Sequence, residues 1–586
     1  MILVRLVLSA ALVAIFGVPN ASAQVLDDSL RNSAVRGCTG SKSVIIRTRP
    51  GAREALRKSL AAQGRRVKGE FPSLDAITAE VRCGDLHALA GFRETASVSD
   101  NATVQGHQLT TDAMATANSS WSRLMEAASA QQLQANLFST LGVRQSVLGT
   151  LTGYVMSPVG VAIVDSGIQR GLDFGSRITA FYDFTHGDIR AAAPSDEYGH
   201  GTHVAGLAAG TYVGVAASAR LIGLKVLDAQ GQGTTDNVIR AIEFAVVNKN
   251  ALNIKVINLS LGHQIFESAA TDPLVQAVEH ASRAGIIVVV SAGNFGRNVT
   301  TGQIGYGGIA SPGNAPSGIT VGSLRTFETV SRHDDRIAAY SSRGPSRYDR
   351  FVKPDISAPG DNLLSVAAVG STLRLAQERR GNVGNYMRLS GTSMAAGVVS
   401  GMVALILQSN QNLTPNALKM VLQYSSIPVT NDGGPGFDVL THGAGSANAG
   451  GAITLARAIN PALALGQKWL TASVTPRTII GGEMYVWAQR MVWGNHIAHG
   501  IGIIDEQRPS WALNIVWGDG LEDDDNIVWG NSDDDNIVWG NLFDDDDNIV
   551  WGNLFDDDDN IVWGNLFDDD DNIVWGNSAL LGSVLR

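Results

Sequence analysis

Short apolar runs alternate with helix-like segments through the middle of this chain, and this alternation constrains the fold more than any other feature. The runs occupy residues 161–164, 221–227, 256–259 and 286–290. Helix-like segments lie between them at 238–246 and 274–284. Runs so short and so nearly continuous are typical of strands buried on both faces. Strands joined by crossover helices form a parallel sheet, so residues 138–460 predict an α/β domain with helices on both faces of the sheet.

The N-terminus has the pattern of a secretory signal peptide. Arg5 precedes an apolar run of 13 residues at 6–18, too short to span a bilayer, and Ala21-Ser22-Ala23 forms a small-residue cleavage site. We therefore expect residues 1–23 to be removed and the protein to be secreted, to the medium, the cell surface or the periplasm. An uncleaved anchor is the alternative. No later stretch predicts a transmembrane segment.

Residues 42–106 predict a small α+β domain. Apolar residues at 52, 56 and 60 share one helical face, and apolar and polar residues alternate over 77–82 as in a half-buried strand. The expected order of strand, helix, strand and helix suits a split βαβ domain. Residues 107–137, rich in Thr, Ala, Ser and Gln, follow as a linker or processing region.

The chain has two cysteines, Cys38 and Cys83. In an exported protein they allow one disulfide, which would join two points of the N-terminal segment and leave the α/β domain without one. Free thiols are the alternative.

The C-terminal part is repetitive and acidic. The sequence Asn-Ile-Val-Trp-Gly occurs six times within residues 513–577, after a connecting region at 461–512. Residues 511–586 carry a charge of −19, so the rest of the chain carries +8 of the net −11. The chain has no dense basic cluster, and the acidic part would oppose phosphate, so nucleic acid is not expected as a partner.

These repeats predict either stacked coils or an extended acidic tail. In a stack the Asp runs would repel one another, and divalent cations would relieve that repulsion. Calcium, which prefers oxygen ligands, is therefore expected as a stabilising ion, although the known calcium-binding spacings are absent and no metal-binding residue can be named.

Four short motifs in the middle region carry groups capable of catalysis. Asp165 ends one apolar run, His200 begins a small-residue helix, Asn294 follows another run, and Ser393 opens a second helix. Taken singly, each has a structural explanation as a turn former, a core histidine or a helix cap. We expect His203 to be a buried core histidine, because the His-Glu-x-x-His zinc arrangement is absent.

Together, and in this order, these motifs resemble those of the subtilisin-like serine proteases, the subtilases, over about 320 residues. The resemblance implies a subtilisin-like fold with an Asp-His-Ser triad. Ser393 would be the nucleophile, His200 the general base and then acid, and Asp165 the partner that orients His200. Asn294 and the backbone N–H of Ser393 would stabilise the oxyanion. One departure is Gly397-Val398, where the family usually has Pro-His; it removes no catalytic group.

The resemblance also implies substrate-binding residues. They are Gly231, Gly233, Ser260, Leu261, Gly262, Ala292 and Gly293. The first five resemble two family strands between which a peptide adds as a third strand, and the last two would line the primary pocket. Phe295 follows Asn294 where an acidic residue would attract basic side chains, which favours large apolar side chains in that pocket. Residues 42–106 resemble the propeptide of the family, an inhibitory folding chaperone.

We therefore expect an exported serine endopeptidase, made as a precursor, that hydrolyses peptide bonds through an acyl-enzyme. Its partners would be protein or peptide substrates and its own propeptide as an intramolecular inhibitor, and catalysis would need no cofactor. A second hypothesis is a surface-, matrix- or calcium-binding protein. In it the repeats carry the binding function, and the protease domain serves mainly the protein's own maturation. A third is a zymogen that stays inhibited.

Overall fold

The computed structural model describes two compact units. One comprises Met1–Glu70 with Asp75–Asp100, and the other comprises Phe71–Leu74 with Asn101–Arg586. The described residues are 25–106, 137–143, 158–298, 300–379, 384–429, 437–463, 467–494, 496–500, 502–505, 515–517, 527–529, 538–539 and 550–551. The predicted signal peptide and nearly all of the predicted linker lie outside these residues.

The first unit holds a four-stranded sheet in the order β2-β3-β1-β4. Its strands are β1 Ser41–Thr48, β2 Arg66–Phe71, β3 Ala76–Arg82 and β4 Thr95–Asp100, and its helices are α1 Asp28–Val35, α2 Arg53–Ala62 and α3 Leu86–Ala90. β1 pairs antiparallel with both β3 and β4. The chain order β1-α2-β2-β3-α3-β4 is a split βαβ arrangement, in which β2 and β4 are strands that the sequence pattern did not indicate.

The core of this unit lies between its sheet and its helices. Ile46 and Ile77 of the sheet share a buried cluster with Leu56 and Leu60 of α2. Cys38 and Cys83 form a disulfide that links the chain after α1 to the chain after β3, 45 residues apart. On the chain-entropy account, closing a loop of this length stabilises a domain by about 4 kcal/mol.

The second unit is built on a nine-stranded sheet in the order β16-β15-β13-β11-β6-β9-β7-β8, with β17 also beside β15. The strands are β6 Gly160–Asp165, β7 Ile178–Asp183, β8 Arg190–Ala191, β9 Arg220–Lys225, β11 Ile254–Leu259, β13 Ile287–Ser291, β15 Ile319–Arg325, β16 Arg336–Ile337 and β17 Ile356–Pro359. All pairs are parallel except those of β8 and β16. The predicted α/β fold with a parallel sheet is confirmed.

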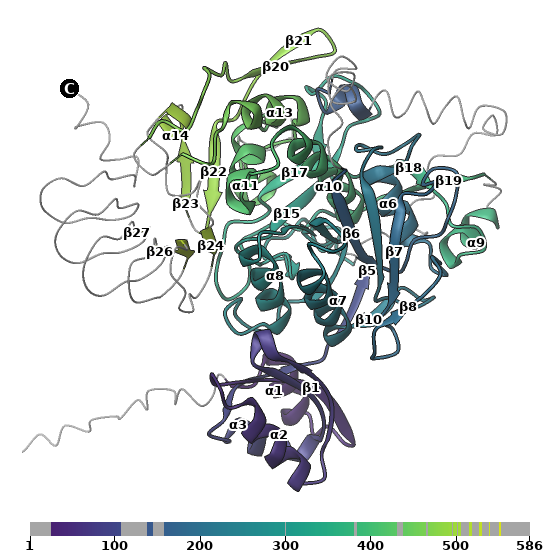
Figure 1. The fold of residues 1–586 in the computed structure, drawn as a ribbon, viewed down its shortest axis with the longest axis vertical. Helices are drawn as coiled ribbons and strands as arrows, with labels where there is room; N and C mark the ends of the chain where they lie inside the picture. The colour runs from purple at the N-terminus through teal and green to yellow at the C-terminus, as the bar shows by residue number, and fades with distance from the viewer. Residues whose placement is uncertain are drawn as a thin grey trace, which may run out of the picture. The chain divides into compact units, whose positions relative to one another are not determined.

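Helices cover both faces of this sheet (Figure 1). The main ones are α6 His200–Ala209, α7 Thr235–Val247, α8 Pro273–Arg283, α10 Thr392–Ser409, α11 Pro415–Tyr424 and α13 Ala449–Ala458. Alternate strand residues, among them Val161, Ile163 and Val289, share one core with α6 and α10. Because successive strand side chains point to opposite faces, the buried residues between them face the other side, where α7 and α8 pack.

Shorter elements complete this unit. They are β5 Thr103–Gly106, β10 Gln232–Thr234, β12 Leu261–Gln264, β14 Ala310–Ser311, β18 Leu363–Val366, β19 Tyr386–Leu389, α9 Thr372–Glu378, α12 Val439–His442 and α14 Gly502–Asp505. β5, β10, β12 and β14 form a small sheet of their own.

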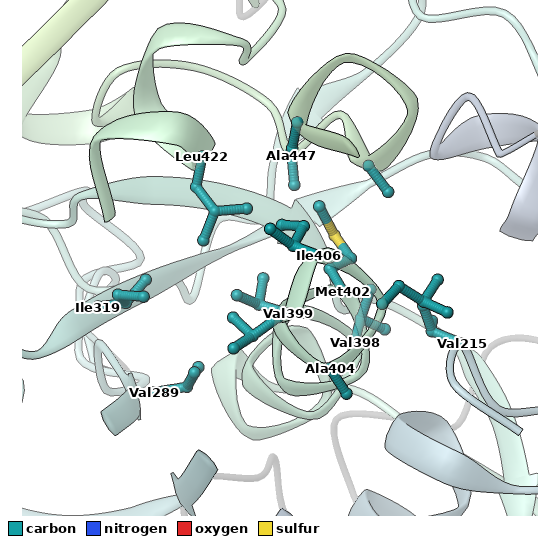
Figure 2. Packing of buried hydrophobic residues seen from close by; sticks show 14 of the residues in the cluster. Val215, Val289, Ile319, Val398, Val399, Met402, Ala404, Ile406, Leu422 and Ala447 are labelled. Atoms are coloured by element: carbon teal, nitrogen blue, oxygen red, sulfur yellow. The ribbon is translucent and has the colours of Figure 1, made fainter. Parts of the chain in front are cut away.

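Helix α10 is the centre of the core. Figure 2 shows Val398, Val399, Met402 and Ile406 pointing from this helix toward partners on several sides, including Val289 and Ile319 of the sheet. By length and composition this helix could cross a membrane, but 94% of it is buried inside the protein. A helix that is apolar all round is typical of a protein core.

The segment predicted as a connecting region folds against the same core. It forms two hairpins, β20 Arg477–Ile480 with β21 Glu483–Val486 and β22 Arg490–Trp493 with β23 His496–His499. Trp487 is buried edge-on to Tyr424 of α11, and its Nε1 donates to Thr478 Oγ1 over 2.8 Å. Gln423 also exchanges hydrogen bonds with the backbone of Val492.

Four strands of the repeat segment are described: β24 Ile515–Trp517, β25 Ile527–Trp529, β26 Val538–Trp539 and β27 Val550–Trp551. They pair in parallel and in register, so that Trp517 lies opposite Trp529 and Trp539 opposite Trp551. Equivalent positions of successive repeats therefore stack on one another in this part of the chain.

Two glycines of α10 allow it to approach α6 closely. A Cβ on Gly401 would lie 2.6 Å from the backbone oxygen of Ala208, and a Cβ on Gly397 would lie 3.1 Å from that of Val204. The first contact is sterically forbidden, whereas the second needs an adjustment of a few tenths of an ångström. Gly397, the departure from the family motif, thus stands where the two helices are in close contact.

We predict that Gly401→Ala destabilises the protein and that Gly397→Ala does not. Overpacking against backbone costs about 1–3 kcal/mol, whereas Ala in place of Gly inside a helix stabilises by about 1 kcal/mol. Thermal unfolding of both variants in a Ser393→Ala background, which removes self-digestion, measures the difference. Equal melting temperatures for the two variants would contradict this view of the α6–α10 contact.

Candidate active site

Asp165 and His200 meet where β6 ends and α6 begins. His200 Nδ1 lies 2.7 Å from Asp165 Oδ1 and 2.9 Å from Oδ2, and both side chains are fully buried. A Cβ on Gly201 would lie 2.2 Å from the backbone oxygen of Gly167, so the glycine after His200 lets the start of α6 approach the chain after β6 this closely.

This contact determines the tautomer of His200. A carboxylate only accepts hydrogen bonds, so Nδ1 carries the proton and Nε2 presents a lone pair. His200 Nε2 is buried and has no hydrogen-bond partner among the described residues. Such an oriented, unpartnered ring nitrogen can take a proton from a nearby hydroxyl.

Ser393 is the second residue of α10. Its Oγ donates to the backbone oxygen of Ser260 over 2.9 Å, and Ser260 Oγ donates to the backbone oxygen of Ser393 over 3.0 Å. These bonds tie the start of α10 to the chain after β11. The N–H groups and positive dipole end of this long helix also face the region of the hydroxyl, where they favour negative charge.

The side-chain amide of Asn294 lies beside the same helix start, and among the described residues only its oxygen has hydrogen-bond partners. Its Oδ1 accepts from the backbone N–H of Thr392 over 3.0 Å and from Thr392 Oγ1 over 3.1 Å. These bonds fix the amide orientation, and Nδ2 is left buried without a partner among the described residues. A buried donor without a partner costs about 1–3 kcal/mol, and a bound group with an acceptor atom would remove that cost.

A segment of the chain itself occupies the groove beside these residues. β5 lies between β10 and β12 and pairs antiparallel with both. Val104 is opposite Gly233, and Gln105 is opposite Gly262. A Cβ on Gly106 would lie 3.2 Å from His200 Cε1, so this backbone runs directly against the imidazole.

Of the other predicted substrate-binding residues, Leu261 lies beside this strand and Ser260 directly precedes Leu261, and the rest have contacts elsewhere. Leu261 pairs with Gly106, and Ser260 bonds to Ser393. Gly231 has a positive φ of 75°, and a Cβ there would meet the ring of Tyr198. Ala292 is buried, and the Gly293 N–H donates to Thr392 Oγ1 over 3.2 Å. Phe295 is 48% exposed.

Sequence reasoning did not find two features of this site. The first is β5, which the sequence pattern placed at the end of the small α+β domain and which lies in the groove of the second unit. The second is Asp196, a buried carboxylate close to both Asp165 and His200. No local sequence pattern marked it, because its role depends on donors that the fold brings to it.

Among the described residues, no group of three or more His, Cys, Asp or Glu side chains is arranged to hold a metal ion. One buried set of oxygens, from Asp355, Ala315 and Gly318, is instead occupied by the ammonium groups of Lys353 and Lys419. Calcium remains a prediction, and its most acidic candidate region, the Asp runs of the repeats, lies outside the described residues.

Comparisons with known proteins agree with this geometry. The family model described as "Subtilase family" (Peptidase_S8) matches residues 157–449. The chain is 39% identical over 312 residues to "Serine protease AprX" of Bacillus subtilis (strain 168), covering 51% of this chain and 66% of the relative. It is 31% identical over 261 residues to "Alkaline serine exoprotease A" of Vibrio alginolyticus, covering 44% of this chain and 40% of the relative. It therefore spans less than two thirds of each of these relatives.

A solved structure shares the fold. Fervidolysin from Fervidobacterium pennivorans, described as a keratinolytic enzyme related to subtilisin, superposes with a TM-score of 0.54 at 22% sequence identity, over 71% of this chain and 61% of that one. The parallel sheet with its Asp, His and Ser at strand and helix ends defines the subtilisin-like class. With a family match over half its length, the chain belongs to the subtilase family.

His203 lies on the same helix as His200, but its ring bonds to backbone oxygens and not to a carboxylate. Its Nε2 donates to the backbone oxygens of Leu363 and Met387 over 3.2 and 3.1 Å, as expected for a core histidine. Burial lowers the pKa of His203 from its ordinary value to about 3, with a smaller contribution from His200. The folded protein therefore holds this ring neutral well below the pH at which the unfolded chain protonates it.

We predict that His203 makes the protein sensitive to acid. Since its folded pKa lies below its unfolded value of about 6.5, its contribution is complete above that pH and is lost as the pH falls toward 3. Two proteins are compared between pH 6 and 4, Ser393→Ala and Ser393→Ala/His203→Gln. The free energy of unfolding should fall with decreasing pH more steeply in the protein that keeps His203, by about 1 kcal/mol per pH unit. Chemical denaturation at several pH values measures both slopes, and parallel slopes would refute the prediction.

Proposed function

We propose that this protein is an exported serine endopeptidase made as a precursor, which hydrolyses peptide bonds through an acyl-enzyme at Ser393. The observation that carries the proposal is the pairing of β5 in the groove between β10 and β12, with its backbone against His200. An extended peptide held by main-chain hydrogen bonds between two strands is how such a groove would hold a substrate.

Catalysis follows from the atoms around that peptide. In the proposed step the Ser393 hydroxyl turns from the Ser260 backbone oxygen to His200 Nε2. His200 Nε2 then takes its proton as Ser393 Oγ attacks the carbonyl carbon, and Asp165 stabilises the imidazolium that forms. Asn294 Nδ2 and the Ser393 backbone N–H donate to the oxyanion, and in this family removal of the asparagine donor costs about 10²–10³ in kcat. His200 then protonates the leaving amine, and water releases the acyl group by the reverse sequence.

Maturation would begin with the chain's own peptide bond. β5 reaches His200 at Gly106, so the first bond to be cut follows closely after that residue. The segment before it would then act as an intramolecular inhibitor until it dissociates. Export is proposed from the signal-peptide pattern, and one relative carries the name of an exoprotease.

We predict that the wild type shortens itself and that Ser393→Ala does not. The intact mass of the purified product should show wild-type protein cleaved on the C-terminal side of Gly106, while the variant keeps that bond. Replacing Ser393 removes the nucleophile and little volume, so the variant should still fold. If both proteins keep the bond, self-maturation is refuted and the hypothesis of a permanently inhibited zymogen takes its place.

We predict that Gly106→Val slows self-cleavage and that Gln105→Val does not. Any Cβ at position 106 lies against His200, whereas Gln105 is exposed. Crowding that raises the barrier by about 1–3 kcal/mol slows a reaction by about 5- to 150-fold. The first-order rate at which the refolded precursor is cut measures both variants. Equal rates would show that β5 does not lie against His200 when the bond breaks.

A second function is favoured by the stacked strands of the repeat segment. In-register pairing of β24 to β27 brings equivalent backbone positions of successive repeats side by side, a regular spacing that a binding array could use. Under this alternative the repeats retain the protein at a cell surface or bind calcium, and the protease serves maturation. Deleting residues 513–577 would then remove retention or calcium binding and leave proteolysis intact.

A further inference from the structure

A buried carboxylate that the catalytic scheme does not use lies four residues before His200. Asp196 is 3% exposed and accepts four hydrogen bonds. Its Oδ1 accepts from Ser166 Oγ over 2.8 Å and from the Gly199 N–H over 2.7 Å. Its Oδ2 accepts from the Thr202 N–H over 2.8 Å and from Thr202 Oγ1 over 2.7 Å. The donors are two backbone amides and two hydroxyls, and none is a cation.

These donors lie beside the two residues of the catalytic pair. Ser166 directly follows Asp165, and its N–H donates to Asp165 Oδ1 over 2.7 Å. Gly199 directly precedes His200, and Thr202 follows it by two residues. Ser166 Oγ in turn accepts from the Gly201 N–H over 3.0 Å. One carboxylate thus connects the end of β6 to both sides of His200 on α6.

The bonding suits a carboxylate, because two backbone N–H groups and two hydroxyls point at its two oxygens. Burial raises the pKa of Asp196, while the bonds from Thr202, Gly199 and Ser166 favour the charged form. An asparagine has the same shape, but in either orientation its NH₂ group would face one backbone N–H and one hydroxyl. The hydroxyl can turn to accept from the NH₂ group, whereas the backbone N–H would lose its acceptor, and the start of α6 would lose the negative charge beside its first-turn N–H groups.

We propose that Asp196 is a positioning residue that locks the start of α6 to the end of β6 and so fixes the angle at which His200 meets Asp165 and Ser393. It touches neither substrate nor reacting atoms. The proposal rests on the endopeptidase function proposed above. Its consequence is that loss of Asp196 lowers the rate of the chemical steps more than the affinity for peptide.

The chain offers a matched control in Asp272. This residue is 2% exposed, caps α8 through the N–H groups of Leu274 and Val275, and accepts from Ser311 Oγ over 2.7 Å. Asp272→Asn therefore makes the same chemical change in a buried helix cap away from His200. Both variants should lower the melting temperature, which separates a general loss of stability from a loss of positioning.

The test compares Asp196→Asn, Asp272→Asn and wild type in steady-state hydrolysis of one peptide substrate. We expect Asp196→Asn to lower kcat by about 10- to 100-fold relative to Asp272→Asn, with KM changed far less, because a small misplacement of a catalytic group has effects of this size. A kcat within about threefold of that of Asp272→Asn, or a loss confined to KM, overturns the proposal. Absence of Ser393-dependent hydrolysis in wild type would instead overturn the proposed function.

A second measurement does not depend on activity or on maturation. In the inactive Ser393→Ala protein, the His200 Nδ1 proton shared with Asp165 should give a far-downfield NMR signal, assigned by its loss in His200→Ala. Adding Asp272→Asn should leave this signal, and adding Asp196→Asn should shift or abolish it. If Asp196→Asn fails to fold, Ser166→Ala tests the same link, and an unchanged signal in that variant counts against the proposal.

Discussion

The hydrogen bond between Asp165 and His200 is the contact on which the rest of this structure depends. Its two residues come from different elements, a strand end and a helix start, and both are fully buried. A buried carboxylate is costly unless it is hydrogen-bonded, and a buried imidazole needs a defined tautomer. The bond meets both needs, and it leaves Nε2 as the His200 ring nitrogen without a hydrogen-bond partner among the described residues.

The fold holds that bond from several sides. The parallel order of β6, β9 and β11 brings the carboxyl ends of the strands to one edge of the sheet, where Asp165 stands and where Ser260 follows β11. Behind them, Gly397 and Gly401 of α10 allow close contact with α6, so the helices that carry Ser393 and His200 are packed on each other. Asp196, in the loop before α6, accepts hydrogen bonds from Ser166 after β6 and from Thr202 of α6. Movement of any one element would therefore change how Ser393 lies relative to His200.

Much of this could be predicted from the sequence because local patterns determine it. The apolar runs at 161–164 and 256–259 lie within β6 and β11, since strands buried on both faces need nearly continuous apolar side chains. The motifs around Asp165, His200 and Ser393 lie at the strand end and helix starts that their spacing indicated. Asn294 was located, but that its Nδ2 is a buried donor without a partner is a tertiary property.

Other features depend on long-range contacts that no local pattern records. The placement of β5 between β10 and β12 joins segments more than 100 residues apart, and a four-residue strand has too few residues for a periodic signal. The hairpins after α13 looked like a connection because their strands are short, and only the burial of Trp487 against Tyr424 shows that they belong to the core. Asp196 resembles any loop aspartate until its four donors are identified.

The central claim is that Ser393 is a nucleophile activated by His200 within this buried cluster. It is tested most directly by labelling the matured protein with a fluorophosphonate, which reacts only with an activated serine, and locating the adduct by peptide mass spectrometry. We expect one adduct, on Ser393, and its loss in a separately matured His200→Ala protein. An adduct on another residue, or equal labelling of Ser393 without His200, would contradict the claim.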